Sequence, residues 1–370
     1  MNIIKQLRNA SIKLPAIGQG MGDYKWDESH IDVLRAGIDL GMNFIDTAES
    51  YDKGHSEEII GKAIKGIREK VIIGTKIAPE HHSEKDVLKA AEGSLRRLQT
   101  DYIDLYQIHW PNPTFPLKNT MAALERLVKE GKVRYIGVGN FYLRELQEAR
   151  LALQSEIIVS LQTEYNLFDR MIEDGILPYC QRNNIFIIAY SPLDQGRVAD
   201  GKGRKDLLGK IAKKYGKTAA QVALRWLINK LPVVVIPKAK NLKHLRENAN
   251  STDFNLEKNE IDEIDKVFKR QIVRVLPDRI RISTQGQGNK RVYQTIEEAI
   301  ENKLCFVPSP VELARSLVKE EDIKPVRLIR TLDKIGKYDY DLIEGRVRYW
   351  AWVIAYGNMP IPAYIREDCP

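Results

Sequence analysis

The sequence has few cysteines and no long apolar run. Only Cys180, Cys305 and Cys369 occur in 370 residues, and this odd number at wide spacing predicts neither a disulfide framework nor a zinc site. Nowhere do about 18 apolar residues follow one another, and Lys5 and Arg8 precede any apolar run of signal-peptide length. We therefore expect a soluble cytoplasmic protein in a reducing compartment, with no membrane segment and no bound metal.

A concentrated excess of charge is also lacking. The formal net charge of +8 divides into +2 for residues 271–370, which hold 16 Lys+Arg and 14 Asp+Glu, and +6 for residues 1–270. A dedicated nucleic-acid binder carries a denser basic footprint than this. Nucleic acid is therefore an unexpected partner, although it is not ruled out, and the mild positive balance suits phosphorylated ligands.

Material for a core is plentiful, because hydrophobic residues make up 43% of the chain and charged residues 29%. From about residue 14, short β-branched runs alternate with longer runs of helical period, which predicts parallel strand-helix-strand units. The eight expected strands are LPAIGQG (14–20), NFIDTA (43–48), VIIGTKI (71–77), YIDLYQIHW (102–110), VRYIGVGN (133–140), IVSLQTEY (158–165), IFIIAYSPL (185–193) and VVVIPK (233–238).

Eight parallel strands predict a closed (β/α)8 barrel of the TIM type over residues 1–270, an α/β fold that commonly takes about 250 residues. The alternative is an open parallel sheet with helices on both faces. Such a sheet usually has a glycine fingerprint after its first strand, and GQGMGD at 18–23 lacks the third glycine. The sequence therefore favours the barrel.

Polar residues occupy the ends of successive strands. Asp46 ends the second strand with Tyr51 just beyond it, Lys76 ends the third, His109 the fourth and Asn140 the fifth. Each has a structural explanation when taken alone, such as a turn-capping aspartate or a satisfied core histidine. Because the carboxyl ends of barrel strands meet at one mouth, the set together predicts an active site there.

These residue types suit the transfer of a proton to a carbonyl oxygen. A phenol has an unperturbed pKa near 10, and a nearby lysine ammonium lowers it. In this arrangement Asp46 would hold the Lys76 ammonium charged, and His109 would orient the carbonyl beside Tyr51. None of these side chains donates hydride, so the reduction of a carbonyl at this site requires a cofactor.

Seven segments give the chain a resemblance to the aldo-keto reductase family over about residues 5–268. They are NFIDTAESY, GTKI, YIDLYQIHWP, GVGNF, LQTEYNLF, AYSPL and IPKAKNLKHLREN, and they occur in the family's order. The resemblance implies reduction of a small aldehyde or ketone to an alcohol, with Tyr51 as general acid. It also implies that Lys76 and Asp46 tune the phenol and that His109 orients the substrate.

The same resemblance implies NADPH as cofactor, with NADH as the alternative. The residues that it assigns to the cofactor are Gly20, Met21, Asn140, Gln162, Tyr190, Ser191, Leu193, Lys238, His244 and Asn248. Gly139 replaces the usual serine before the asparagine, and His244 replaces an arginine that many members use for the 2′-phosphate. Lys238, with Lys240 nearby, still favours NADPH. Trp26 and Trp110 are expected to wall the substrate pocket.

Residues 271–370 are expected to form a second, smaller α+β domain. QIVRVLPDRIRIS (271–283) predicts a strand, and SPVELARS (309–316) predicts a capped helix that leads into another strand. YDYDLIEGRVRYWAWVIAYGNMPIPAYIRE (338–367) resembles the ParB/sulfiredoxin-like fold, over about residues 271–367. The resemblance implies a nucleoside triphosphate at a helix start formed by Gly345, Arg346 and Arg348.

This second resemblance has departures of its own. Val347 stands where relatives often carry histidine, which weakens the case for phosphotransfer. The turn contains no cysteine, so sulfiredoxin-type chemistry is not expected. The structural alternative is that Arg346 and Arg348 lie on a solvated helix face.

Three functions remain open on the sequence alone. The first is an NADPH-dependent carbonyl reductase with an appended nucleotide-binding domain. The second is a cofactor-binding sensor or regulatory protein whose second domain recognises nucleotide or DNA. The third is a separate kinase-like activity of the second domain. The complete set of Asp46, Tyr51, Lys76 and His109 favours the reductase, because a sensor could lose Tyr51 or His109 without cost.

Overall fold

The computed structural model describes residues 3–7, 12–22, 25–200, 206–269, 272–282, 292–317, 323–331 and 336–366. Cys369 and most of the polar loop expected at 284–292 lie outside these residues. The chain separates into two compact units, one of residues 1–111 with 115–269 and the other of residues 112–114 with 270–370. Each unit is described by itself.

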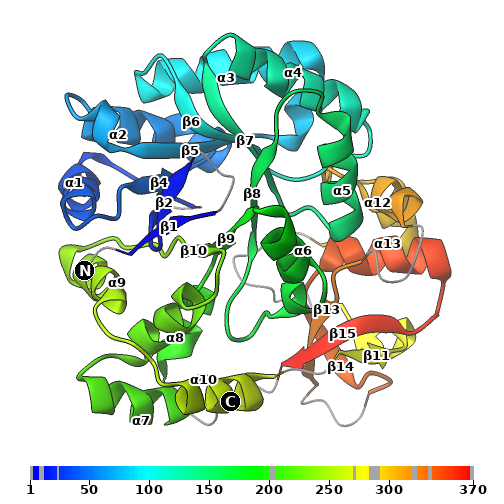
Figure 1. Cartoon of the computed structure of the whole chain (residues 1–370). Helices are drawn as coiled ribbons and strands as arrows, with labels where there is room; N and C mark the ends of the chain where they lie inside the picture. Colours follow the sequence, from blue (N-terminus) through cyan, green and yellow to red (C-terminus); the bar gives the residue numbers. More distant parts are fainter. Residues whose placement is uncertain are drawn as a thin grey trace. The chain divides into compact units, whose positions relative to one another are not determined.

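The first unit is built on eight parallel strands that pair in sequence order, each with the next (Figure 1). They are β3 (Gln19–Gly20), β4 (Phe44–Asp46), β5 (Ile72–Ile77), β6 (Ile103–Ile108), β7 (Val133–Gly139), β8 (Ile158–Glu164), β9 (Phe186–Tyr190) and β10 (Val233–Val235). A parallel bridge between Ile17 and Val235 joins the first strand segment to the last. The (β/α)8 barrel predicted from the sequence is thus confirmed.

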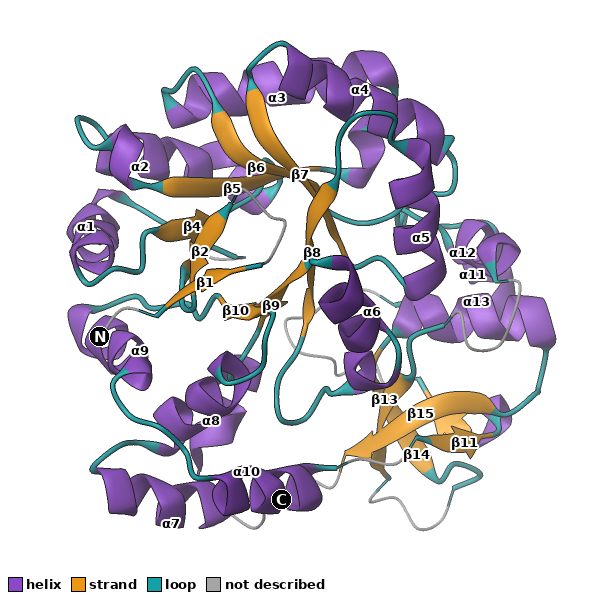
Figure 2. Cartoon of the chain, in the orientation of Figure 1, coloured by secondary structure: helices purple, strands orange, loops and turns teal. Residues whose placement is uncertain are grey.

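Helices lie outside the strands, as Figure 2 shows in purple around orange. They are α1 (Ile31–Asp39), α2 (His55–Ala63), α3 (Glu84–Leu98), α4 (Leu117–Lys129), α5 (Leu143–Ala152), α6 (Ile176–Asn183), α7 (Asp206–Tyr215), α8 (Ala219–Ile228), α9 (Leu242–Ala249) and α10 (Lys258–Phe268). Helix α3 illustrates the local cause: the Ser83 side chain caps its first turn, and Val87, Ala91 and Leu95 form one buried face.

The first strand is shorter than the sequence predicted, because its amino-terminal part belongs to a hairpin. Strands β1 (Ile4–Gln6) and β2 (Lys13–Pro15) pair antiparallel. The buried Lys5 amine donates to the carbonyl oxygens of Ile228 at 2.6 Å, Lys230 at 3.0 Å and Val233. Since Val233 begins β10, the hairpin lies at the amino ends of the strands, away from the mouth.

Strand residues alternate between two apolar layers. On β6, Leu105 belongs to the cluster inside the barrel, whereas Tyr106 and Ile108 pack outward against the helices. On β4, Phe44 points inward and Ile45 outward in the same way. This period of two sends the side chain of the next residue, Asp46, to the inside of the barrel above Phe44.

The second unit is an α+β unit with a five-stranded mixed sheet in the order β11-β15-β13-β14-β12. The strands are β11 (Val273–Val275), β12 (Ile280–Arg281), β13 (Val326–Arg330), β14 (Tyr340–Glu344) and β15 (Ile361–Arg366), and the helices are α11 (Ile296–Ile300), α12 (Pro310–Ser316) and α13 (Arg346–Tyr356). Its core contains Tyr293, Leu328 and Trp352, all with no exposed surface.

One expectation for this unit is wrong. The sequence predicted one strand over 271–283, but two short strands, β11 and β12, are separated by a 3₁₀ turn at Pro277–Arg279. Pro277 has no amide hydrogen to donate to a neighbouring strand, which interrupts the pairing there. In the described parts of both units, no helix is long and apolar enough to cross a membrane.

Candidate active site

Four side chains meet at the carboxyl ends of β4, β5 and β6. Lys76 Nζ lies 2.7 Å from Asp46 Oδ2 and also donates to the Thr47 carbonyl oxygen at 2.6 Å. The same ammonium lies 3.4 Å from Tyr51 Oη, whose oxygen lies 3.5 Å from His109 Nε2. The sequence predicted these four residues as a set, and the fold brings them into contact.

The electrostatics of this group are set by burial and by the ion pair. Lys76 has no exposed surface. Burial opposes its charged form, but the Asp46 carboxylate and Tyr51 outweigh burial and raise the pKa of Lys76. Burial, followed by the nearby Lys76 charge, lowers the pKa of His109 to about 3. At neutral pH the site therefore holds a charged lysine and an uncharged imidazole.

Such an arrangement can deliver a proton to an oxygen atom. The phenol of Tyr51 lies between an ammonium, which favours its ionised form, and a neutral imidazole, which can donate one hydrogen bond to a substrate oxygen. The Tyr51 and His109 rings meet edge to face, with centroids 5.4 Å apart. The phenol hydroxyl and the imidazole Nε2 therefore converge on one point at the mouth.

The Asp46 carboxylate is fixed from both sides. Its Oδ2 accepts the Lys76 bond, and its Oδ1 accepts from Gln162 Nε2 at 2.7 Å and from Gln107 Nε2 at 3.3 Å. All three partners are buried. The sequence did not single out Gln107, although its position two residues before His109 on the same strand face could have suggested it.

The side chains predicted to hold a nicotinamide lie on three adjacent strand ends. Asn140 follows β7, donates from Nδ2 to the His109 carbonyl oxygen at 3.0 Å, and accepts from the Tyr190 hydroxyl at 2.9 Å. Gln162 is on β8 and Tyr190 ends β9. Two side-chain amides beside a phenol ring are a donor and acceptor set that fits a carboxamide on an aromatic ring.

The presence of glycine at position 139 has a steric explanation in this structure. A Cβ atom at this position would lie 2.7 Å from the His109 carbonyl oxygen and 2.9 Å from that of Ile108. A serine there would require the β6 backbone to move. The departure from the family pattern therefore reflects how closely β7 approaches β6.

The residues predicted for the rest of the cofactor come from the ends of the first strand and of the last two strands, and from helix α9. Ser191 and Leu193 follow β9, and Ser191 has a left-handed backbone with φ of 47°. Lys238 is exposed after β10, and Asn248 is buried on α9. Gly20 packs so closely that a Cβ would lie 2.6 Å from the Ile236 carbonyl oxygen.

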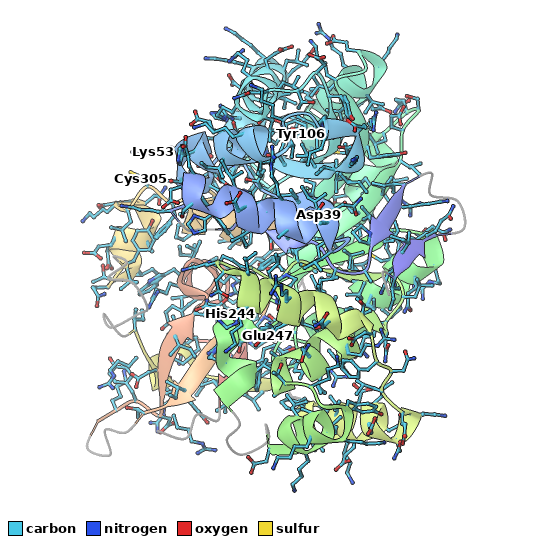
Figure 3. The ribbon with its side chains drawn as sticks, turned by 90° about the vertical axis from the view of Figure 1, so that its left-hand side faces the viewer. Asp39, Lys53, Tyr106, His244, Glu247 and Cys305 are labelled. Atoms are coloured by element: carbon cyan, nitrogen blue, oxygen red, sulfur yellow. The ribbon has the colours of Figure 1, made fainter. Side chains whose placement is uncertain are left out.

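Two members of this predicted set have surroundings that restrict what they can contact. Met21 has no exposed surface, and its amide donates to the Asp46 carbonyl oxygen at 2.9 Å. His244 is exposed on the first turn of α9, and its Nδ1 lies 3.2 Å from Glu247 Oε2 (Figure 3). That carboxylate lies beside the residue that replaces the arginine of many family members.

The two tryptophans predicted to wall a substrate pocket differ in exposure. Trp110 directly follows His109 and is 45% exposed. Trp26 is 3% exposed, and its Nε1 donates to the Met21 carbonyl oxygen at 3.0 Å. Gly22, which the sequence did not single out, lies close to the chemistry, because a Cβ there would be 4.0 Å from Tyr51 Oη.

In the second unit, Gly345 has a left-handed φ of 93° and precedes α13, as predicted for a turn into a helix. Arg346 Nε and Nη2 are buried atoms with no hydrogen-bond partner in the described part of the chain. Arg348 is different, since Nη1 donates to the carbonyl oxygens of Lys324 at 3.0 Å and Pro325 at 2.9 Å. The backbone therefore engages Arg348, whereas these two nitrogens of Arg346 are left over among the described residues.

Comparison with known proteins places the first unit. A model of the Aldo/keto reductase family matches residues 16–269. Methylglyoxal reductase YeaE of Escherichia coli (strain K12) is 38% identical over 265 residues, covering 70% of this chain and 93% of that protein. Glyoxal reductase of Bacillus subtilis (strain 168) is 36% identical over 272 residues, covering 73% and 94%. A solved aldo-keto reductase from Klebsiella pneumoniae in complex with NADPH has a TM-score of 0.66 and 38% identity, covering 72% of this chain and 95% of that chain.

Proposed function

The chain belongs to the aldo/keto reductase family, and on that premise we propose that it uses NADPH to reduce small aldehydes and 1,2-dicarbonyl compounds. The observation that carries the proposal is the contact chain from Asp46 through Lys76 to Tyr51 and His109. An NADPH-dependent carbonyl reductase requires a proton donor at the substrate oxygen. These four residues provide one.

In the proposed reaction, the reduced nicotinamide supplies a hydride to the carbonyl carbon when NADPH is bound. His109 is uncharged and donates a hydrogen bond to the carbonyl oxygen, which fixes that oxygen beside Tyr51. The Tyr51 hydroxyl gives its proton to this oxygen as negative charge develops on it, and the alcohol forms. Lys76 stabilises the remaining phenolate until solvent returns the proton.

The cofactor would be held by residues that take no part in proton transfer. Asn140 and Gln162 would bind the carboxamide, and the Tyr190 ring would stack on the nicotinamide. Ser191 and Leu193 would contact the diphosphate, with Gly20, Met21 and Asn248 completing the site. Lys238 would meet the 2′-phosphate as a point charge.

The substrate class is the finer part of the proposal. The relatives named methylglyoxal reductase and glyoxal reductase suggest small dicarbonyl compounds. Gly22 lies beside Tyr51 Oη and has no side chain, which leaves room there for a compact substrate. Trp110 and Trp26 would border it.

The test is a turnover assay that follows the absorbance of reduced nicotinamide. Methylglyoxal, glyoxal, simple aldehydes and quinones are screened with NADPH and with NADH. We expect NADPH oxidation, fastest with a dicarbonyl, and none with Tyr51→Phe. Tight NADPH binding without turnover of any carbonyl would instead support the cofactor-binding sensor.

For residues 271–370 we propose a ParB/sulfiredoxin-like domain that binds a nucleoside triphosphate at the start of α13. The specific support is Arg346, whose Nε and Nη2 are buried without a partner among the described residues. A guanidinium with unused donors beside helical amide groups suits a phosphate. Arg348, by contrast, would hold the turn in place through its bonds to backbone carbonyls.

A further inference from the structure

Two carboxylates flank Tyr51 in the sequence, and both reach the strand that carries Lys76. Glu49 Oε1 accepts a hydrogen bond from the Ala78 amide at 2.7 Å. Glu57 Oε1 accepts one from Thr75 Oγ1 at 2.6 Å. Thr75 directly precedes Lys76, and Ala78 follows Lys76 by two residues. The two hydrogen bonds therefore attach to the chain on either side of Lys76, and the two carboxylates that accept them lie on either side of Tyr51 in the sequence.

Both carboxylates are shielded from water and have a second partner. The Glu49 side chain is 9% exposed, and its Oε1 also lies 2.8 Å from His81 Nδ1. The Glu57 side chain has no exposed surface, and its Oε2 lies 2.7 Å from Arg97 Nε. Charged hydrogen bonds in such surroundings are stronger and better fixed than those at a surface.

The segment between the two carboxylates needs such anchors because its own backbone is irregular. Asp52 and Lys53 have left-handed backbones with φ of 47° and 55°, and Gly54 has φ of 92°. Left-handed backbones at non-glycine residues are strained and persist only where surrounding contacts hold them. Tyr51, at the start of this segment, bonds through its amide to the Ala48 carbonyl oxygen at 3.1 Å.

We propose that Glu49 is a positioning residue for the reduction. Glu57, which follows Tyr51 in the sequence, acts in the same way through its bond to Thr75. Through the Ala78 amide, Glu49 fastens the Tyr51 segment to the end of β5 and so sets the distance from Tyr51 Oη to Lys76 Nζ. The Glu49 backbone amide also bonds to β5, because it donates to the Lys76 carbonyl oxygen at 3.3 Å. The inference rests on the proposed role of Tyr51 as general acid.

The first test compares Glu49→Ala with Glu49→Gln. Glu49→Ala should lower kcat at least tenfold while the Kd for NADPH stays within twofold. It should also raise the pKa of the basic limb of the kcat/KM profile, because the phenol moves away from the Lys76 ammonium. Glu49→Gln keeps an oxygen acceptor for the Ala78 amide and should stay within about threefold of the wild type. Glu58→Gln, on the exposed face of α2, is the matched control and should change nothing.

A second variant removes the other partner of the same bond. Ala78 has φ of −70°, which proline adopts, so Ala78→Pro deletes the amide hydrogen without forcing the backbone. It should lower kcat as Glu49→Ala does, and the double variant should be no slower than the slower single variant. Ala78→Pro therefore tests the bond even if Glu49→Ala does not fold.

Two outcomes would overturn the positioning role. One is an unchanged kcat and pH profile in both Glu49→Ala and Ala78→Pro. The other is fully additive loss in the double variant, which would mean that the two residues act separately. Tyr51→Phe distinguishes this failure from failure of the proposed function: if Tyr51→Phe keeps its activity, the general acid is misassigned, whereas an inactive Tyr51→Phe beside a fully active Glu49→Ala removes only the positioning role.

Discussion

Lys76 and Asp46 form an ion pair with 2.7 Å between Nζ and Oδ2, and their side chains are 0% and 3% exposed. An ion pair so well shielded from water is costly to form, and in this position it keeps an ammonium charged within 3.4 Å of the Tyr51 phenol. Stability alone is a weak reason for such a pair. In the proposed reaction its use is electrostatic, because the charge favours loss of the phenol proton.

Replacing Tyr51 by phenylalanine should abolish carbonyl reduction and leave NADPH affinity nearly unchanged. The phenol acts on the substrate oxygen, whereas the residues proposed for the cofactor are on other strands. General acid catalysis contributes about 10²–10⁴-fold, so steady-state kcat should fall by at least a hundredfold. If kcat falls by less than tenfold while a fluorescence titration shows unchanged NADPH affinity, the proton comes from a donor other than Tyr51.

Lys76→Met should harm both activity and stability, because it leaves the Asp46 carboxylate buried without its cation. Removing one partner of a buried pair costs about 3–5 kcal/mol, which urea unfolding would detect. Adding Asp46→Asn should recover part of this stability but none of the kcat. Recovery of kcat in the double variant would contradict a role for the ammonium in tuning Tyr51.

Lys238→Met should weaken the preference for NADPH. Only NADPH carries a 2′-phosphate, so the KM for NADPH should rise about tenfold or more while the KM for NADH changes little. Lys258→Met, at an exposed lysine of α10, serves as the control. Equal effects of Lys238→Met on both cofactors would show that Lys238 meets some other group.

Acid should destabilise the first unit through His82, which is 2% exposed. Burial, and next the neighbouring His81, lower the pKa of His82 to about 4 from an ordinary value near 6.5. Between these values the unfolded chain binds the proton and the folded chain does not, so stability falls as the pH drops from about 6.5 towards 4. In urea unfolding, the free energy of unfolding of His82→Asn should decrease by on the order of 3 kcal/mol less than that of the wild type over this pH range. His55→Asn, at a more exposed histidine, is the control and should keep the pH dependence of the wild type. An identical pH dependence of stability in the wild type and His82→Asn would contradict the prediction.

Arg346→Ala should abolish nucleotide binding by the full-length protein and leave its reductase activity intact. We expect ATP or another triphosphate to bind the wild type in calorimetric titration, and at a hundredfold excess over Kd to stabilise it by about 2.7 kcal/mol. Arg348→Ala should instead lower the melting temperature, because Arg348 bonds the backbone at Lys324 and Pro325. If no common triphosphate binds, residues 271–370 are better explained as an interaction or pocket-covering module.

Much of the candidate active site could be predicted from the sequence because it depends on local patterns. Asp46, Lys76 and His109 each end a run of strand type, and alternation by two places them on the inner face of a barrel. Parallel strands joined by helices have their carboxyl ends on one side, so the three residues could be expected together before any distance was known.

Contacts that depend on distant segments were not accessible in this way. Glu49 and Glu57 show no periodicity that points to Ala78 or Thr75, and Lys5 gives no sign of bonding to carbonyl groups more than 220 residues away. Arg346 and Arg348 look alike in the sequence, yet only Arg348 is engaged by the backbone.

The sequence by itself determined the order of strands and helices in the barrel and which polar residues end the strands, because hydrophobic periodicity and turn residues act over a few positions. Only the tertiary structure decided how Tyr51 is held against Lys76, why Gly139 cannot carry a side chain, and that Lys5 bonds the amino-terminal hairpin to the segment around β10. Those outcomes depend on atoms brought within about 3 Å by packing between segments far apart in the chain, and local patterns do not encode such distances.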